Sequence, residues 1–212
     1  MHNPFREAEF ALGAARIAQL PPDTGTEIAF AGRSNAGKSS ALNALCGRRA
    51  LARVSRTPGR TREINVFRLP PEGSRRLVDL PGYGYAKVAP AQRAQWDRLI
   101  GRYLRERRSL VGLVLIMDIR RPMTELDREL LEWLGPQPRL LHVVLTKADK
   151  VSRGEAARQL QQTRRQLEAM GLQATLQVFS ALKREGVEDL QGLLLEWLGK
   201  ATGEADGPSG SG

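Results

Sequence analysis

The 212-residue chain has one cysteine, two histidines and no long apolar segment. A single thiol, Cys46, cannot form an intrachain disulfide, and this is typical of proteins in a reducing compartment. No apolar run approaches the roughly 20 residues needed to cross a bilayer, and residues 1–20 lack the uninterrupted apolar stretch of a secretory signal. His2 and His142 have no metal-ligand companions. We therefore expect a cytoplasmic protein without disulfides or a transmembrane segment.

Acidic residues are scarce relative to basic ones. The chain has 23 Asp and Glu against 33 Lys and Arg, which gives a net charge of +10. This excess favours a polyanionic partner, either RNA or an anionic membrane surface. A solvated basic surface without a fixed partner is the alternative. The arginines concentrate in residues 48–62 and in the helix expected over residues 90–108.

Short apolar runs alternate with amphipathic segments, and this order predicts an α/β fold. Strands are expected at residues 27–31, 64–69, 75–79, 111–117, 140–145 and 176–179, and helices at 39–46, 90–108, 124–134, 152–170 and 187–198. We predict a mostly parallel six-stranded sheet with one antiparallel edge strand and helices on both faces. The domain is expected over residues 25–199, between a helical or strand-like lead-in at 1–24 and a disordered tail at 200–212.

Residues 32–39, GRSNAGKS, match the P-loop pattern G-x-x-x-x-G-K-[ST] between an expected strand and an expected helix. In this context backbone N–H groups converge on phosphate oxygens, and the helix N-terminus adds a partial positive charge. Lys38 would reach the β- and γ-phosphates, and the Ser39 hydroxyl would bind Mg²⁺. The predicted phosphate-binding residues are Gly32, Arg33, Ser34, Asn35, Ala36, Gly37, Lys38 and Ser39.

Two further segments complete the expected phosphate site. The segment Asp79-Leu80-Pro81-Gly82 ends an expected strand, so its carboxylate can hold Mg²⁺ and its glycine N–H can reach the γ-phosphate. The basic loop before it carries hydroxyls that can bind the metal only while the γ-phosphate is present. We assign this role to Thr61, which with Lys38 is expected to be catalytic, and Thr57 is the alternative. The loop residues expected at the nucleotide are Gly59, Arg60, Thr61, Arg62 and Glu63.

Base selectivity is expected from Thr146-Lys147-Ala148-Asp149, which follows another strand. A carboxylate can accept both the ring N–H and the exocyclic amine of guanine, whereas adenine offers no such pair of donors. The segment Phe179-Ser180-Ala181 follows the last strand and could offer backbone amides to the guanine oxygen. An ATPase is the alternative, and Asp149 disfavours it.

The ordered series GRSNAGKSS, TPGRT, DLPG, TKAD and SAL resembles the TrmE-Era-EngA-EngB-Septin-like GTPases. DLPGYGYA, and the later DIRRP with Asp127, resemble the EngB family of bacterial ribosome-biogenesis GTPases. The resemblance covers nearly the whole chain. It implies a Ras-like P-loop NTPase fold, GTP/GDP and Mg²⁺ as ligands, and the large ribosomal subunit or its precursor, with ribosomal RNA, as partner. It also implies a role in ribosome assembly and in normal cell division and septation.

Tyr83 occupies the position where Ras-like proteins carry the glutamine that orients the attacking water. We therefore expect slow intrinsic hydrolysis that needs assistance from a partner or a cation. Asn35 resembles the residue linked to potassium-assisted hydrolysis in relatives, which suggests K⁺ as that cation. We expect a monomer. A nucleotide-regulated membrane- or septum-associated scaffold is the alternative function.

Overall fold

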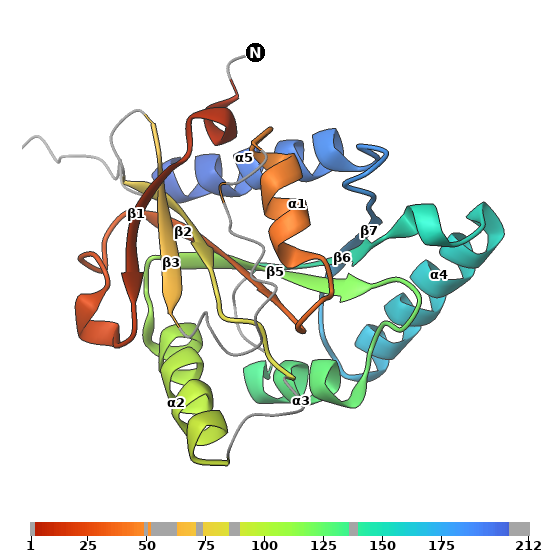
Figure 1. The fold of residues 1–212 in the computed structure, drawn as a ribbon, viewed down its shortest axis with the longest axis horizontal. Helices are drawn as coiled ribbons and strands as arrows, with labels where there is room; N and C mark the ends of the chain where they lie inside the picture. Colours follow the sequence, from red (N-terminus) through yellow and green to blue (C-terminus); the bar gives the residue numbers. More distant parts are fainter. Residues whose placement is uncertain are drawn as a thin grey trace, which may run out of the picture.

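The computed structural model describes residues 3–48, 51, 63–70, 74–84, 90–135 and 140–203, and a seven-stranded sheet forms its centre (Figure 1). The strands are β1 (Glu9–Ala14), β2 (Thr26–Gly32), β3 (Ile64–Leu69), β4 (Arg75–Asp79), β5 (Leu110–Asp118), β6 (Leu140–Thr146) and β7 (Thr175–Val178). Their order in the sheet is β1-β3-β4-β2-β5-β6-β7. The pairs β2–β4, β2–β5, β5–β6 and β6–β7 are parallel.

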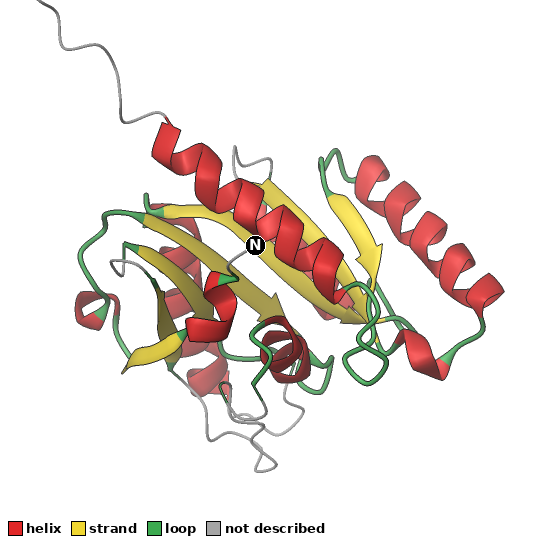
Figure 2. Ribbon diagram, turned by 90° about the horizontal axis from the view of Figure 1, so that it is seen from above, coloured by secondary structure: helices red, strands yellow, loops and turns green. Residues whose placement is uncertain are grey.

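Helices cover both faces of the sheet (Figure 2). The helices α1 (Lys38–Leu45) and α5 (Val187–Gly203) pack on one face, and α2 (Pro90–Glu106), α3 (Glu125–Leu134) and α4 (Arg153–Ala169) pack on the other. Three short 3-10 helices complete the described elements: η1 (Pro4–Glu7), η2 (Ile17–Gln19) and η3 (Ala148–Lys150). Within the described residues, no helix is long and apolar enough to span a membrane.

The predicted α/β, Ras-like class is confirmed, but the prediction of six strands with an antiparallel strand at the edge was wrong. The extra strand, β1, comes from the segment expected as a lead-in, and it pairs antiparallel with β3. Because β3 is also antiparallel to β4, the reversed strand lies second from the edge. β1 satisfies backbone groups of β3 that would otherwise face solvent. The division of the chain at residue 24 remains a prediction.

Several helix ends follow from local hydrogen bonds. Thr124 caps α3, and its backbone N–H and hydroxyl both donate to Asp127 Oδ2, at 2.9 and 2.7 Å. These bonds belong to the capping box that begins α3. The Ser152 hydroxyl likewise accepts the backbone N–H of Glu155 at 3.2 Å and begins α4. α5 continues to Gly203, beyond the predicted end at residue 198, and the rest of the predicted tail, 204–212, lies outside the described residues.

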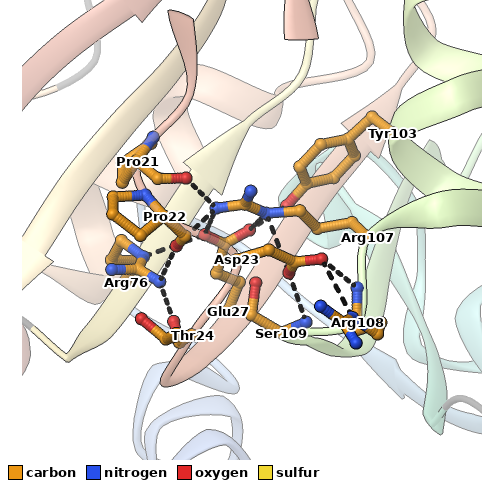
Figure 3. A network of polar contacts seen from close by, with 10 residues as sticks. All are labelled: Pro21, Pro22, Asp23, Thr24, Glu27, Arg76, Tyr103, Arg107, Arg108 and Ser109. Carbon is orange, nitrogen blue, oxygen red and sulfur yellow. Dashed lines mark hydrogen bonds and ion pairs between the residues drawn. The ribbon is translucent and has the colours of Figure 1, made fainter. Parts of the chain in front are cut away.

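A buried charge network closes the amino-terminal end of β2 (Figure 3). The Glu27 carboxylate lies between two guanidinium groups and is 1% exposed. Arg76 Nε donates to Glu27 Oε1 at 2.8 Å, and Arg107 Nη2 donates to the same oxygen at 2.6 Å. The Tyr103 hydroxyl of α2 donates to Glu27 Oε2 at 2.9 Å. These bonds hold the carboxyl-terminal end of α2 against the sheet.

Asp23 joins the segment before β2 to this network. Its carboxylate accepts the backbone N–H groups of Ser109 and Arg108 at 2.8 and 3.1 Å. Although burial raises the pKa of Asp23, these hydrogen bonds hold it at about 2. Arg107 Nη2 also donates to the Pro21 carbonyl at 2.9 Å. The connection between β1 and β2 is therefore fastened to the segment that follows α2.

Candidate functional site

The residues singled out by motif gather at one edge of the sheet, where the parallel strands end. β2 ends at Gly32, β4 at Asp79 and β6 at Thr146. Phe30 pairs with Asp79, and Asp118 at the end of β5 pairs with Thr146. Ligands of open α/β sheets bind outside the carboxyl ends of the strands. The topology therefore brings the separate motifs into one site.

The loop between β2 and α1 turns through two residues with positive φ. Asn35 has a φ of 64° and Gly37 a φ of 99°, and α1 begins at the next residue, Lys38. Asparagine tolerates the left-handed φ of Asn35, but a φ of 99° favours glycine, and a Cβ on Gly37 would also lie 3.2 Å from Thr146 Oγ1. The Thr146 hydroxyl contacts the Ala36 carbonyl and the Met117 carbonyl, the latter at 3.0 Å. Thr146 thus ties the loop to the ends of β5 and β6.

A lysine and a carboxylate meet beside this loop. Lys38 Nζ donates to Asp79 Oδ1, and the two side chains are 11% and 9% exposed. Ser39, the next residue of α1, is partly buried. A cation and a carboxylate are therefore paired at the N-terminus of a helix whose second residue carries a hydroxyl, a set of groups suited to phosphates and their counter-ions.

The segment after β4 packs tightly against the loop. Leu80 and Pro81 are buried, and the Leu80 N–H donates to the Phe30 carbonyl at 3.0 Å. A Cβ on Gly82 would lie 3.2 Å from Ser34 Oγ. The side chains of the first two residues thus belong to the core, whereas the Gly82 backbone lies against the phosphate loop.

The loop expected to sense the γ-phosphate is represented only by Glu63. This residue is exposed and directly precedes β3, at the same edge of the sheet as Asp79. The remaining predicted residues, Thr57, Gly59, Arg60, Thr61 and Arg62, lie outside the described residues.

The base-recognition motifs lie side by side at the ends of β6 and β7. The Ala148 N–H donates to the Phe179 carbonyl at 3.1 Å. The Ser180 hydroxyl donates to Asp149 Oδ1 at 2.7 Å, and this bond lowers the pKa of Asp149. Phe179 is fully buried, and Ala181 is partly buried. The fold therefore presents an ionised, oriented carboxylate next to the phosphate loop.

Lys147 connects the two halves of the site. It has a φ of 61°, and its Nζ donates to the Asn35 carbonyl at 2.6 Å and to Asp118 Oδ2 at 2.9 Å. The predicted residues of the phosphate loop and of the base motif are thus in direct contact.

Comparison with known proteins decides the family. The family model described as "50S ribosome-binding GTPase" matches residues 27–147. A protein of Azoarcus sp., named probable GTP-binding protein EngB, is 52% identical over 208 residues, which are 98% of this chain and 99% of the relative. A relative of the same name from Aromatoleum aromaticum is 54% identical over 195 residues, 92% of this chain and 89% of the relative. The chain belongs to the EngB family of GTPases.

Solved structures of other proteins share this fold. The crystal structure of a probable GTP-binding protein EngB has a TM-score of 0.62 and 21% identity, and the match covers 82% of this chain and all of the other. Era from Aquifex aeolicus, crystallised with GDP and AlF₄⁻, has a TM-score of 0.64 and 22% identity over 89% of this chain and 58% of the other. At such identities these likenesses show the fold alone.

Asp118 is a site residue of this EngB-family chain that motif reasoning did not assign. Its carboxylate accepts from Lys147 Nζ, from the Arg120 N–H at 3.1 Å, and from Arg120 Nη2 at 2.7 Å. Although burial raises the pKa of Asp118, the bonds from Arg120 and Lys147 lower it further than burial raises it. The sequence offered one signal for this role: Asp118 ends β5, the strand that pairs with the T-K-x-D strand β6.

The arginines expected to meet a polyanion divide into two groups in this EngB-family chain. Arg107 is 7% exposed and pairs with Glu27, so its assignment to a partner-binding surface was wrong. Burial against a carboxylate makes it part of the fold. The exposed arginines near the end of α2 are Arg98, Arg102, Arg105 and Arg108.

Proposed function

We propose that this GTPase binds GTP and GDP with Mg²⁺ and acts as a switch that assists assembly of the large ribosomal subunit. The contact between Ser180 and Asp149 carries the guanine assignment. An ionised, oriented carboxylate can accept both donors on the guanine edge, and adenine would leave it without a partner. The N–H groups of Phe179 and Ser180 donate to the Leu145 and Glu185 carbonyls at 2.8 and 3.1 Å, so the Ala181 N–H is the amide of this segment that we propose for the guanine oxygen.

The guanine assignment is tested by Asp149→Asn. Exchanging the acceptor for an amide should reduce the preference for GTP over ATP by at least about a hundredfold, because a mismatched polar pair is strongly disfavoured. Competition against a fluorescent GDP measures both affinities. Asp189→Asn, which changes an exposed carboxylate in the first turn of α5, is the matched control. An Asp149 variant that keeps the wild-type preference would reject this assignment.

The phosphate side fits a magnesium ion. Ser39 and Asp79 offer a hydroxyl and a carboxylate, the oxygen ligands that Mg²⁺ prefers, and Thr61 is the third proposed ligand. The bound ion would neutralise charge on the phosphates. Lys38, held beside Asp79, is proposed to bind the β- and γ-phosphate oxygens, and the backbone of residues 32–37 to surround them. Omission of Mg²⁺ should weaken GTP binding more in the wild type than in Ser39→Ala.

We propose that intrinsic hydrolysis is slow. The Tyr83 hydroxyl donates to the buried Asp127 at 2.7 Å, so it is engaged away from any attacking water. K⁺ bound near Asn35 is the proposed assistant. Hydrolysis should be faster in KCl than in NaCl of equal concentration, and equal rates would reject the role of K⁺.

The proposed partner is the large ribosomal subunit or its precursor, bound through ribosomal RNA by a monomer in the cytoplasm. The matching family is described as ribosome-binding, and the net charge of +10 favours a polyanion. The exposed arginines of α2 lie on the helix that follows the Asp79–Gly82 segment. Tyr103 holds this part of the helix at the end of β2 opposite Gly32, so a polyanion bound there would affect the nucleotide site through the helix and not by contacting it.

Pelleting with ribosomal subunits tests this partner. Binding should be stronger with a GTP analogue than with GDP and should weaken as salt rises. Arg98→Glu with Arg102→Glu should weaken it, whereas Arg164→Glu with Arg165→Glu, an equal charge change on exposed residues of α4, should not. Equal effects of the two pairs would indicate non-specific attraction. Depletion in cells should stall large-subunit assembly and disturb septation.

A further inference from the structure

Tyr83 is fixed through its backbone to the phosphate loop. It forms a parallel bridge with Arg33, and its carbonyl accepts the Ser34 N–H at 2.8 Å and the Ser34 hydroxyl at 3.1 Å. Its own N–H donates to the Gly32 carbonyl at 3.4 Å. The backbone immediately after Gly82 is thereby joined to the start of the phosphate loop.

The side chain of Tyr83 is fixed to a different element. The ring is largely buried, at 7% exposure, and its hydroxyl donates to Asp127 Oδ1 at 2.7 Å. Asp127 is 1% exposed, and its other oxygen accepts two hydrogen bonds from Thr124 in the capping box of α3. The carboxylate therefore cannot rotate without breaking the cap. Tyr83 is held by the first turn of α3.

The two glycines beside Tyr83 are closely packed on both sides. Gly82 faces Ser34, where an added Cβ would lie 3.2 Å from the hydroxyl oxygen. Gly84 has a φ of 78°, and a Cβ there would lie 2.6 Å from Leu126 Cδ1 of α3. The Gly82–Gly84 backbone thus runs from the phosphate loop to α3, with Gly84 exposed, and Tyr83 links the two.

We propose that Tyr83 is a positioning residue for γ-phosphate recognition, because its hydrogen bond to Asp127 holds the Gly82 backbone against the phosphate loop. This inference rests on the proposed function and on the expectation from the sequence that the Gly82 N–H reaches the γ-phosphate of bound GTP. A segment that is ordered before the ligand arrives loses less conformational freedom on binding. GDP lacks the γ-phosphate, so its affinity depends less on this segment. The residue after D-x-x-G thus orders the backbone rather than the water.

The test is Tyr83→Phe, which removes one hydroxyl oxygen and keeps the ring in the core. Dissociation constants for GDP and for a non-hydrolysable GTP analogue are measured by titration calorimetry with Mg²⁺ present. The affinity for the analogue relative to GDP should fall about tenfold, which corresponds to about 1.4 kcal/mol. A ratio equal to that of the wild type, or a higher one, would overturn the proposal.

Tyr103→Phe is the matched control. Tyr103 is also a buried tyrosine whose hydroxyl donates to a buried carboxylate, that of Glu27 at 2.9 Å, but it lies at the opposite end of β2. Tyr103→Phe should lower thermal stability without changing the nucleotide ratio. If it lowers the ratio as Tyr83→Phe does, the effect is general loosening of the fold and the proposal fails.

A double-mutant cycle with Asp127→Ala isolates the hydrogen bond. In the Asp127→Ala background, Tyr83→Phe should leave the ratio unchanged, and a further tenfold fall would overturn the proposal. Failure of the proposed function has a different signature, because wild-type protein would then show no preference for guanine over adenine nucleotides. The two failures are therefore distinguishable.

Discussion

Replacing Glu27 by Gln keeps the size of the side chain and removes the negative charge between Arg76 and Arg107. Both guanidinium side chains are only 7% exposed, so water cannot replace the lost carboxylate. Removing one partner from a buried ion pair costs about 3–5 kcal/mol, most of it from the uncompensated charge that remains. The glutamine oxygen can still accept from Tyr103, so we expect a loss near the lower end, about 3 kcal/mol.

Equilibrium unfolding in urea, followed by circular dichroism, measures this loss. Domains are stable by about 5–15 kcal/mol, so the variant should still fold, with a clearly lower midpoint. Glu106→Gln is the control. Its partner in α2 is Arg102, and the two side chains are 55% and 60% exposed, so the change should cost about 0–1 kcal/mol.

A loss of less than about 1 kcal/mol for Glu27→Gln would refute the reasoning, because it would mean that the buried network contributes no more than a surface pair. Glu27 lies at the end of β2 opposite Gly32. The folded variant should therefore keep the wild-type preference for guanine nucleotides.

Three further predictions concern single residues elsewhere. Burial lowers the pKa of His142 from 6.5 to about 4. As pH falls, this histidine is therefore protonated in the unfolded chain before it is protonated in the folded protein. About 3 kcal/mol of folding stability is lost between about pH 6.5 and pH 4 for this reason. Urea midpoints of His142→Gln should depend less on pH in this window, and identical pH profiles would contradict the prediction. Gly112→Ala should destabilise by about 1–3 kcal/mol because its Cβ would overlap the Trp197 ring. Gly192→Ala, in an exposed position of α5 with open space around it, should stabilise by about 0.5–1 kcal/mol in the same urea assay. A higher urea midpoint for Gly112→Ala than for Gly192→Ala would contradict the reasoning that the space around each glycine determines the effect. Burial raises the pKa of the Cys46 thiol to about 12, so a thiol reagent should react with it only as urea unfolds the chain, and fast labelling of native protein would contradict its burial.

Most elements of the sheet could be predicted from local patterning. The bounds of β3 and β4 match the predicted residues 64–69 and 75–79, because alternating and apolar runs were bounded by turn residues. β1 could not be predicted in this way. Its Phe10 is 59% exposed, and the strand is defined by pairing with β3, whose residues lie 50 to 59 positions later in the chain. The buried ion pairs of Glu27 could not be predicted either, because its partners lie 49 to 80 positions away in the sequence.

In the candidate site, too, local motifs could be predicted from the sequence and contacts between distant residues could not. The phosphate loop, D-x-x-G and T-K-x-D follow from sequence because each needs its residues at fixed local spacing. The contacts of Asp118 with Lys147 and of Tyr83 with Asp127 join residues 29 and 44 positions apart. They depend on which strand ends are neighbours, and only the folded sheet determines that order.

The packing of α5 against the sheet has a consequence for how the chain folds while it is being synthesised. Phe30 and Ile116 face the cluster that contains Trp197 of α5, and the strands that carry them leave the ribosome well before this helix does. A nascent chain that lacks α5 exposes part of this apolar face, and such intermediates are prone to aggregate. The native core is therefore completed only after α5 has emerged from the exit tunnel.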